Sequence, residues 1–251
     1  MDQNLAAAGF QKMSAGVKKR LIVSVQGQEK SGKTHFSLTA PGPIAYFGMD
    51  IGEEGVVDKF LDSGKEIYSA DAQIKVPNTI VMTKGGPTLD AEKAWEKMKV
   101  ALVTALSNGG VRTVVVDTAT EMWELIRLAR FGKLTQVMPM QYGPVNAEMR
   151  GLLRAAFESD KNVILIHKVK AEYVNDKRTG RMERAGFSDT GYIVQVNLRT
   201  YYDGEAGEFG VEVINARQNM RLCGDLYDGD ICTFPMIATM VLEDTSLEDW
   251  E

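Results

Sequence analysis

The chain has 251 residues, of which 44% are hydrophobic and 25% charged, and its net charge is −5 at pH 7. These values are typical of a globular domain with its own core, and they argue against a surface covered by basic patches while permitting a local basic groove. Two cysteines are too few for a disulfide framework and lack zinc-site spacing, so we expect a reducing, cytoplasmic setting. The sequence contains no long apolar run and no apolar segment of secretory type at its start, so we predict neither a membrane span nor a signal peptide.

Apolar runs alternate with segments of helical periodicity along the chain. The predicted strands are Leu21–Val25, Ile44–Met49, Thr79–Thr83, Thr113–Val116, Asn162–Ile166, Val194–Tyr202 and Val211–Ile214. The predicted helices run from Lys33 to the Pro41-Gly42-Pro43 breaker, within Gly52–Gly64, from Asp90 to Gly109, around Trp123–Arg130 and over Val145–Ala156. The predicted loops are Phe131–Pro144 and Lys168–Thr190.

This alternation predicts an α/β fold with a mainly parallel sheet flanked by helices and with antiparallel strands toward the C-terminus. We expect one domain over residues 21–242, a flexible arm at 1–20, and an acidic tail at 243–251 that is solvated and disordered. Right-handed crossovers bring the ends of parallel strands to one edge of the sheet, where ligands bind. The segment Gly27–Thr34 and the residues Asp50, Asp117 and His167 fall at such strand ends.

A phosphate-binding loop follows the first predicted strand and opens a helix. Gly27-Gln28-Glu29-Lys30-Ser31-Gly32-Lys33-Thr34 matches the pattern G-x-x-x-x-G-K-[ST] at every fixed position. Its glycines let backbone N–H groups curl around phosphates, Lys33 reaches the β- and γ-phosphates, and the Thr34 hydroxyl ligates Mg²⁺. We therefore assign Mg-ATP to this loop and to the next residue, His35.

Asp117 closes the apolar strand that begins at Thr113, as a Mg²⁺-binding carboxylate does in P-loop proteins. The alternative role for such an aspartate is a turn or a helix cap. The sequence has no N-K-x-D motif for guanine and no D-x-x-G after this strand, which disfavours a GTPase and leaves ATP as the expected nucleotide.

At this point the chain resembles the RecA-like phage P-loop ATPases, a group that includes core-only recombinases associated with single-strand annealing. The resemblance covers roughly residues 20 to 220. It rests on Gly27–Thr34, Pro43–Asp50, Val114–Trp123, Gln141-Tyr142-Gly143 and Val163–His167 with Lys168 and Lys170.

The resemblance implies roles for four further residues. An acid after the second strand orients the attacking water, which falls to Asp50 with Glu53 next, although Gly52 departs from the usual acid-x-Glu pattern. Glu53 could instead be an ordinary helix-start acid. His167 would sense the γ-phosphate or be structural, and Arg217 would reach a neighbour's γ-phosphate in an oligomer or be a surface arginine.

In RecA-like recombinases, the two loops corresponding to Phe131–Pro144 and Lys168–Thr190 face DNA. The second carries the cations Lys168, Lys170, Lys177, Arg178, Arg181 and Arg184 together with aromatic residues that could stack bases. Acidic residues dilute this charge, and Asn175–Gly180 also has the composition of an ordinary hairpin turn.

The leading hypothesis is an ATPase that acts on single-stranded DNA in phage-type recombination or replication, in a bacterial host cytoplasm. It would form a homo-oligomer and could work with a single-strand-binding or annealing protein. The first alternative is a nucleotide-switched protein that binds a partner and hydrolyses little ATP. The second is a small-molecule kinase with Arg178–Arg184 as its lid.

Overall fold

The computed structural model of this chain describes residues 7–10, 18–50, 55–70, 82–83, 86–87, 91–132 and 137–250. Glu53, most of the predicted arm and residues 79–81 of a predicted strand lie outside these ranges. Within them, no helix combines the length and the apolar character needed to cross a membrane.

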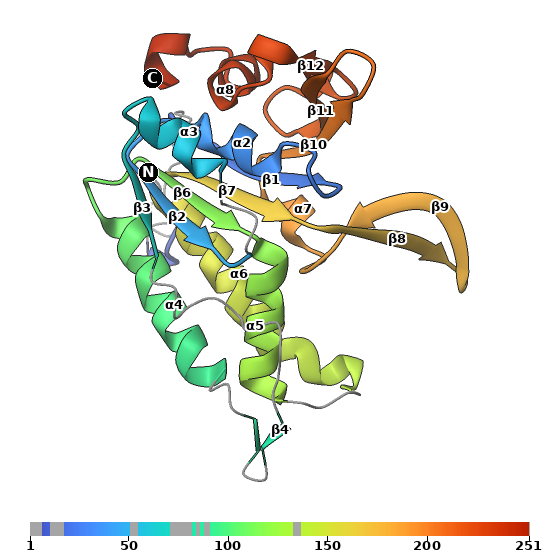
Figure 1. The fold of residues 1–251 in the computed structure, drawn as a ribbon. Coiled ribbons are helices and arrows are strands. Elements are labelled where there is room, and N and C mark those ends of the chain that lie inside the picture. Colours follow the sequence, from blue (N-terminus) through green and yellow to red (C-terminus); the bar gives the residue numbers. More distant parts are fainter. Residues whose placement is uncertain are drawn as a thin grey trace.

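An eight-stranded sheet forms the centre of the molecule (Figure 1). Its strands, in spatial order, are β12 (Leu226–Asp228), β11 (Glu208–Ala216), β10 (Val196–Asp203), β1 (Ile22–Gly27), β7 (Asn162–His167), β6 (Thr113–Asp117), β2 (Ile44–Gly48) and β3 (Ile67–Ser69). The six strands from β10 to β3 are parallel, and β11 and β12 are antiparallel. The predicted α/β fold class is confirmed: the sheet is mainly parallel, with antiparallel strands toward the C-terminus.

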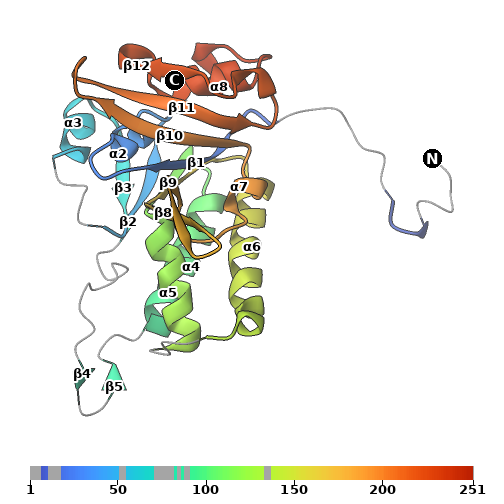
Figure 2. The same cartoon turned by 90° about the vertical axis from the view of Figure 1, so that its right-hand side faces the viewer.

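Helices cover both faces of the sheet (Figure 1 and Figure 2). One face carries α2 (Lys33–Leu38), α3 (Val57–Asp62) and α8 (Phe234–Val241), and the other carries α4 (Ala91–Ser107), α5 (Ala119–Phe131) and α6 (Gly143–Glu158). Outside the sheet lie β4 (Met82–Thr83) with β5 (Gly86–Pro87), the hairpin β8 (Val169–Val174) and β9 (Lys177–Arg184), and α7 (Thr190–Ile193). Four short 3-10 turns complete the described chain: Pro139–Tyr142, Met220–Leu222, Gly229–Ile231 and Leu247–Trp250.

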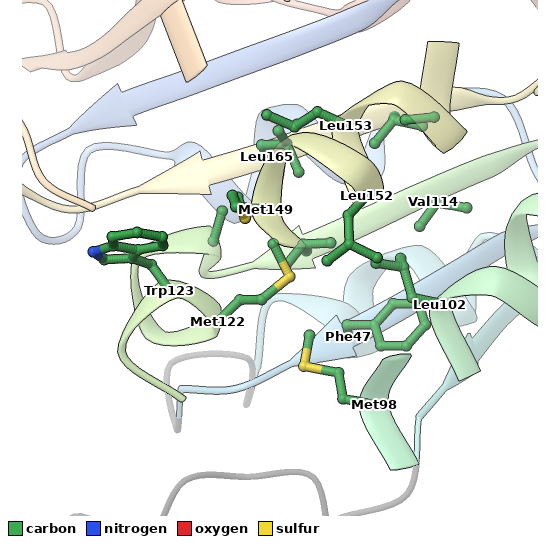
Figure 3. Packing of buried hydrophobic residues seen from close by; sticks show 14 of the residues in the cluster. Phe47, Met98, Leu102, Val114, Met122, Trp123, Met149, Leu152, Leu153 and Leu165 are labelled. Atoms are coloured by element: carbon green, nitrogen blue, oxygen red, sulfur yellow. The ribbon is translucent and has the colours of Figure 1, made fainter. Parts of the chain in front are cut away.

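The central strands β1, β2, β6 and β7 are mainly apolar because they are buried on both faces. Alternate residues of β6 enter different cores: Val114 and Val116 pack toward α4, α5 and α6, whereas Val115 packs with residues of α2 and α8. Figure 3 shows the first core, a cluster to which the helices contribute Met122, Met149 and Leu152 and the strands contribute residues such as Val114. At about 25 cal/mol per Å² of buried apolar surface, these two cores dominate the stability of the domain.

The register of the parallel strands aligns their carboxyl ends. Gln26 of β1 lies opposite His167 of β7, and Asp117 of β6 lies opposite both Ile166 of β7 and Gly48 of β2. The loop after β1 and the polar residues after β2, β6 and β7 are therefore gathered at one sheet edge, as expected.

Several elements differ from the sequence expectations. Ile67–Ser69 is an unpredicted edge strand, and α8 is an unpredicted apolar helix. The expected loop at Phe131–Pro144 includes the end of α5, a 3-10 turn and the start of α6.

The acidic tail was expected to be solvated, and at its described end this is wrong. Trp250 is 1% exposed, stacks edge-on against Phe234 and donates its indole N–H to Thr245. Lys19 pairs with Asp249, and Arg112 donates to the carbonyl of the same residue. One apolar side chain among the acids is enough to anchor the segment, because burying an indole outweighs the solvation of its charged neighbours.

Candidate nucleotide-binding site

The loop after β1 is shaped by two glycines that accept no side chain. A Cβ on Gly27 would overlap the hydroxyls of Thr200 and Ser31. Gly32 has a φ of 86°, which favours glycine, and a Cβ there would lie 2.8 Å from the ring of Phe209. The backbone conformation of this loop therefore requires glycine at both positions, which are the two glycines of the sequence motif.

The Ser31 side chain links this loop to itself and to β10 by hydrogen bonds. The Ser31 hydroxyl donates to the carbonyl of Gln28 at 2.8 Å and shares a 2.8 Å hydrogen bond with the Thr200 hydroxyl. Both side chains are buried. Thr200 was not among the predicted site residues, and only the pairing of β1 with β10 brings it to the loop.

Thr34 and Asp117 meet at the start of α2, although 83 residues separate them. The Thr34 hydroxyl donates to Asp117 Oδ2 at 2.6 Å, and the Tyr46 hydroxyl donates to the same oxygen at 2.9 Å. Burial raises the pKa of Asp117, while these hydrogen bonds and the charge of Lys33 oppose the shift. A hydroxyl and a carboxylate side by side are the oxygen donors that Mg²⁺ prefers, so the two predicted metal residues fit this ion.

Lys33 lies beside the loop, half-buried. Its ammonium donates to the carbonyls of Gly27, at 3.1 Å, and Gln28. Burial lowers the pKa of Lys33, and the negative charges of Asp117 and Asp50 oppose this. An ammonium group held by backbone carbonyls is positioned to exchange those partners for phosphate oxygens.

Asp50, Lys168 and Glu121 form a charged cluster next to this site. Lys168 Nζ lies 3.1 Å from Asp50 Oδ2 and 2.5 Å from Glu121 Oε1. Burial by itself lowers the pKa of Lys168, but the hydrogen bonds and charges of Glu121 and Asp50 outweigh it, so the pKa is raised. The charges of both Asp50 and Lys168 also act on the pKa of Lys33, so the cluster lies near this residue.

Two residues of this cluster, Asp50 and Lys168, have surroundings that differ from those expected from the sequence. Asp50, the expected water-orienting acid, is paired with a cation. Lys168, grouped from sequence with the DNA-facing cations, lies at the nucleotide site, while Glu121 was not predicted at all. The sequence did contain a signal for Glu121. This acid lies in the first turn of the helix that follows Asp117, and a helix that begins there starts at the same edge of the sheet.

His167 is at the predicted strand end but is completely buried. Its Nδ1 lies 3.2 Å from the carbonyl of Ala185, and Nε2 has no hydrogen-bond partner among the described residues. Burial, assisted by the charge of Arg184, lowers the pKa of His167 to about 3, so the ring is neutral at physiological pH. In this conformation the imidazole is buried, and its predicted role as a sensor of the γ-phosphate stays a prediction.

The remaining cations predicted to bind DNA divide into two groups. Lys170, Lys177, Arg178 and Arg181 lie exposed on the β8–β9 hairpin, which projects from the body of the molecule (Figure 1). Arg184 is at the root of the hairpin, where its guanidinium donates to Asn197 Oδ1 and to the carbonyl of Ser188, both at 3.0 Å. Arg184 is thus a structural contact of the hairpin root in this conformation.

Arg217 lies at the opposite edge of the sheet from the loop. It follows Ala216, which pairs with Val196 at the start of β10, and its guanidinium donates to the carbonyls of Tyr192 and Ile193. Within one chain Arg217 does not reach the nucleotide site. Its predicted action on a neighbour stays a prediction.

Two hollows border the loop. A small one of about 140 Å³ lies beside Gly32 and His35 and is lined by Phe209, Gly229 and Cys232. A groove of about 940 Å³ runs from Gly27–Ser31 to the hairpin and is lined by Arg181 and Met182 of β9 and by Arg199 and Tyr202 of β10. The loop is therefore continuous with both a nearby apolar hollow and the base of the projecting hairpin.

The chain is similar to the RadB recombinase of a crystal structure, with 15% identity, 83% of this chain and 86% of that chain covered, and a TM-score of 0.47. A likeness at this level carries no argument about function. No curated protein matches. A family model described as an AAA domain matches residues 19–201, well over half of the chain. The chain therefore belongs to this AAA-domain family, and its phosphate-loop motif and mainly parallel sheet agree with that membership.

Proposed function

We propose that this protein binds and hydrolyses Mg-ATP, and that it does so while acting on single-stranded DNA. The observation that carries the nucleotide assignment is the 2.6 Å hydrogen bond between Thr34, which follows the loop Gly27–Gly32 closely in the chain, and Asp117. When bound, Mg²⁺ would be held by these two residues and would neutralise phosphate charge. Lys33 would add a second positive charge to the β- and γ-phosphates.

The hollow beside His35 is a candidate binding site for the nucleoside. It borders Gly32 and His35 at the helix end of the loop, and it offers the ring of Phe209 together with backbone groups. We assign the base to this hollow. An aromatic ring beside a nucleobase contributes stacking without selecting strongly among bases.

Binding of single-stranded DNA is assigned to the β8–β9 hairpin. Its exposed cations lie beside Tyr173, which is 62% exposed and available for stacking. Cations track phosphates and aromatic rings stack bases in proteins that bind single strands. A homo-oligomer on DNA, a partner annealing protein and a phage-encoded origin belong to the same proposal and stay predictions.

Hydrolysis is expected to be slow without DNA. Asp50 is paired with Lys168 in this conformation, so its carboxylate is not free to orient a water molecule. The same observation favours the second candidate, a nucleotide-switched protein that binds a partner and hydrolyses little ATP. The two candidates differ in the response of the rate to DNA.

The decisive measurement is the ATPase rate with and without single-stranded DNA, beside a Lys33→Ala variant. We expect DNA to raise the rate of the wild-type chain, and we expect Lys33→Ala to lose ATP binding by at least about tenfold, because a charge-assisted hydrogen bond to phosphate contributes about 1.5–3 kcal/mol. Lys97→Ala, an exposed change on α4 outside the loop, is the control. Unchanged ATP affinity in Lys33→Ala would remove the nucleotide assignment, and a rate indifferent to DNA would favour the second candidate.

A further inference from the structure

Tyr46 lies within β2, away from every loop that the motif defines. The side chain is 2% exposed, and its ring packs with Phe36 and Val115 in the core beneath α2. Its hydroxyl donates to Asp117 Oδ2 at 2.9 Å. A buried tyrosine usually directs its hydroxyl to a polar partner, and here that partner is the carboxylate assigned to the metal.

The pairing of β2 with β6 explains how the hydroxyl reaches this carboxylate. Tyr46 lies opposite Val115, and Gly48 lies opposite Asp117. Successive residues of a strand point to opposite faces, so Tyr46 and Asp117 share one face of the sheet with Gly48 between them. Because Gly48 has no side chain, nothing on β2 stands between the tyrosine hydroxyl and Asp117.

Two hydroxyls converge on one oxygen of Asp117, and they come from different parts of the fold. The Thr34 hydroxyl would also give its oxygen to Mg²⁺ as a ligand when the ion is bound. The Tyr46 hydroxyl is fixed by a ring packed in the core and remains in place. A carboxylate restrained through one oxygen presents the other in a fixed direction, as hydrogen bonds behind metal ligands do in other sites.

We propose that Tyr46 is a positioning residue for Mg²⁺, orienting the Asp117 carboxylate through Oδ2 while the nucleotide is bound. The inference rests on the proposed Mg-ATP site and adds to it a residue that lies outside the phosphate-binding motif. Tyr46 touches neither nucleotide nor metal in this role. Its effect is therefore expected on the metal dependence of nucleotide binding and not on the binding of metal-free ATP.

The test is a Tyr46→Phe variant, which removes only the hydroxyl and leaves the packed ring. The affinity for ATP is measured by calorimetry in EDTA and then as a function of Mg²⁺ concentration, alongside thermal melting without ligand. Tyr68→Phe is the matched control, because Tyr68 lies on the adjacent strand β3, is 59% exposed, and donates only weakly at 3.3 Å to Glu66. Removing a group that orients a metal ligand typically weakens metal affinity by about 10- to 100-fold.

We expect Tyr46→Phe to need at least about tenfold more Mg²⁺ for half-maximal enhancement of ATP binding, with affinity in EDTA and the melting temperature close to those of the wild type. A Mg²⁺ dependence equal to that of Tyr68→Phe would overturn the inference. An equal loss of binding with and without Mg²⁺, together with a lower melting temperature, would show a structural role and also overturn it. A wild-type chain that ignores both ATP and Mg²⁺ would instead remove the proposed function itself.

Discussion

At the scale of single residues, Lys168 has two competing assignments that a substitution can separate. Its ammonium lies between Asp50 and Glu121 at the nucleotide site, whereas its position before β8 led us to group it with DNA-binding cations. If the ammonium transfers to the γ-phosphate, Lys168→Met lowers the affinity for ATP by about tenfold and leaves ADP unchanged, since only ATP offers the charge-assisted hydrogen bond that the variant cannot make. Lys170→Met, which removes an exposed cation paired with Glu183 on the hairpin, is the control for both nucleotides. If Lys168→Met binds ATP and ADP as tightly as the wild-type chain does but retains DNA less well, Lys168 belongs to the DNA-binding surface.

At the scale of an element, the β8–β9 hairpin carries the DNA proposal. Changing Lys177, Arg178 and Arg181 to Glu should weaken retention of a single-stranded oligonucleotide, and the salt slope should become shallower by about 0.7 for every phosphate that the variant no longer neutralises. Arg184 is left intact because its hydrogen bonds hold the root of the hairpin. The control makes the same charge change at Lys97, Arg154 and Arg221, exposed residues of α4, α6 and the 3-10 turn Met220–Leu222. Equal retention of both variants would exclude the hairpin as the DNA-binding element.

At the scale of the whole molecule, the segment Leu247–Trp250 closes the core beside α8, and its contribution to stability can be measured. Trp250→Ala removes a side chain that is 1% exposed and packed on Phe234, so we expect the free energy of unfolding to fall by about 3–5 kcal/mol. Leu247→Ala changes an apolar residue of the same turn that is 44% exposed and should cost under about 1 kcal/mol. Urea denaturation checks both values. Similar small losses in the two variants would mean that the segment contributes little to the fold.

The sequence by itself determined the phosphate loop, the alternation of strands and helices, and the edge of the sheet where the site lies. These features depend on local patterns: Gly27–Thr34 is contiguous, and the apolar run Thr113–Val116 identifies a strand buried on both faces without reference to any partner. The β8–β9 turn at Asn175-Asp176, where both residues have positive φ, was likewise visible in the composition of Asn175–Gly180.

Only the tertiary structure decided which side chains meet. Tyr46 and Thr34 reach the same oxygen of Asp117, Lys168 turns to Asp50 and Glu121, and Trp250 is buried within an acidic segment. Each of these meetings depends on the order and register of strands or on the path of a loop, and periodicity within a segment carries no information about either. The sequence could therefore locate the site and name its main groups, while the packing of distant elements selected the residues that position them.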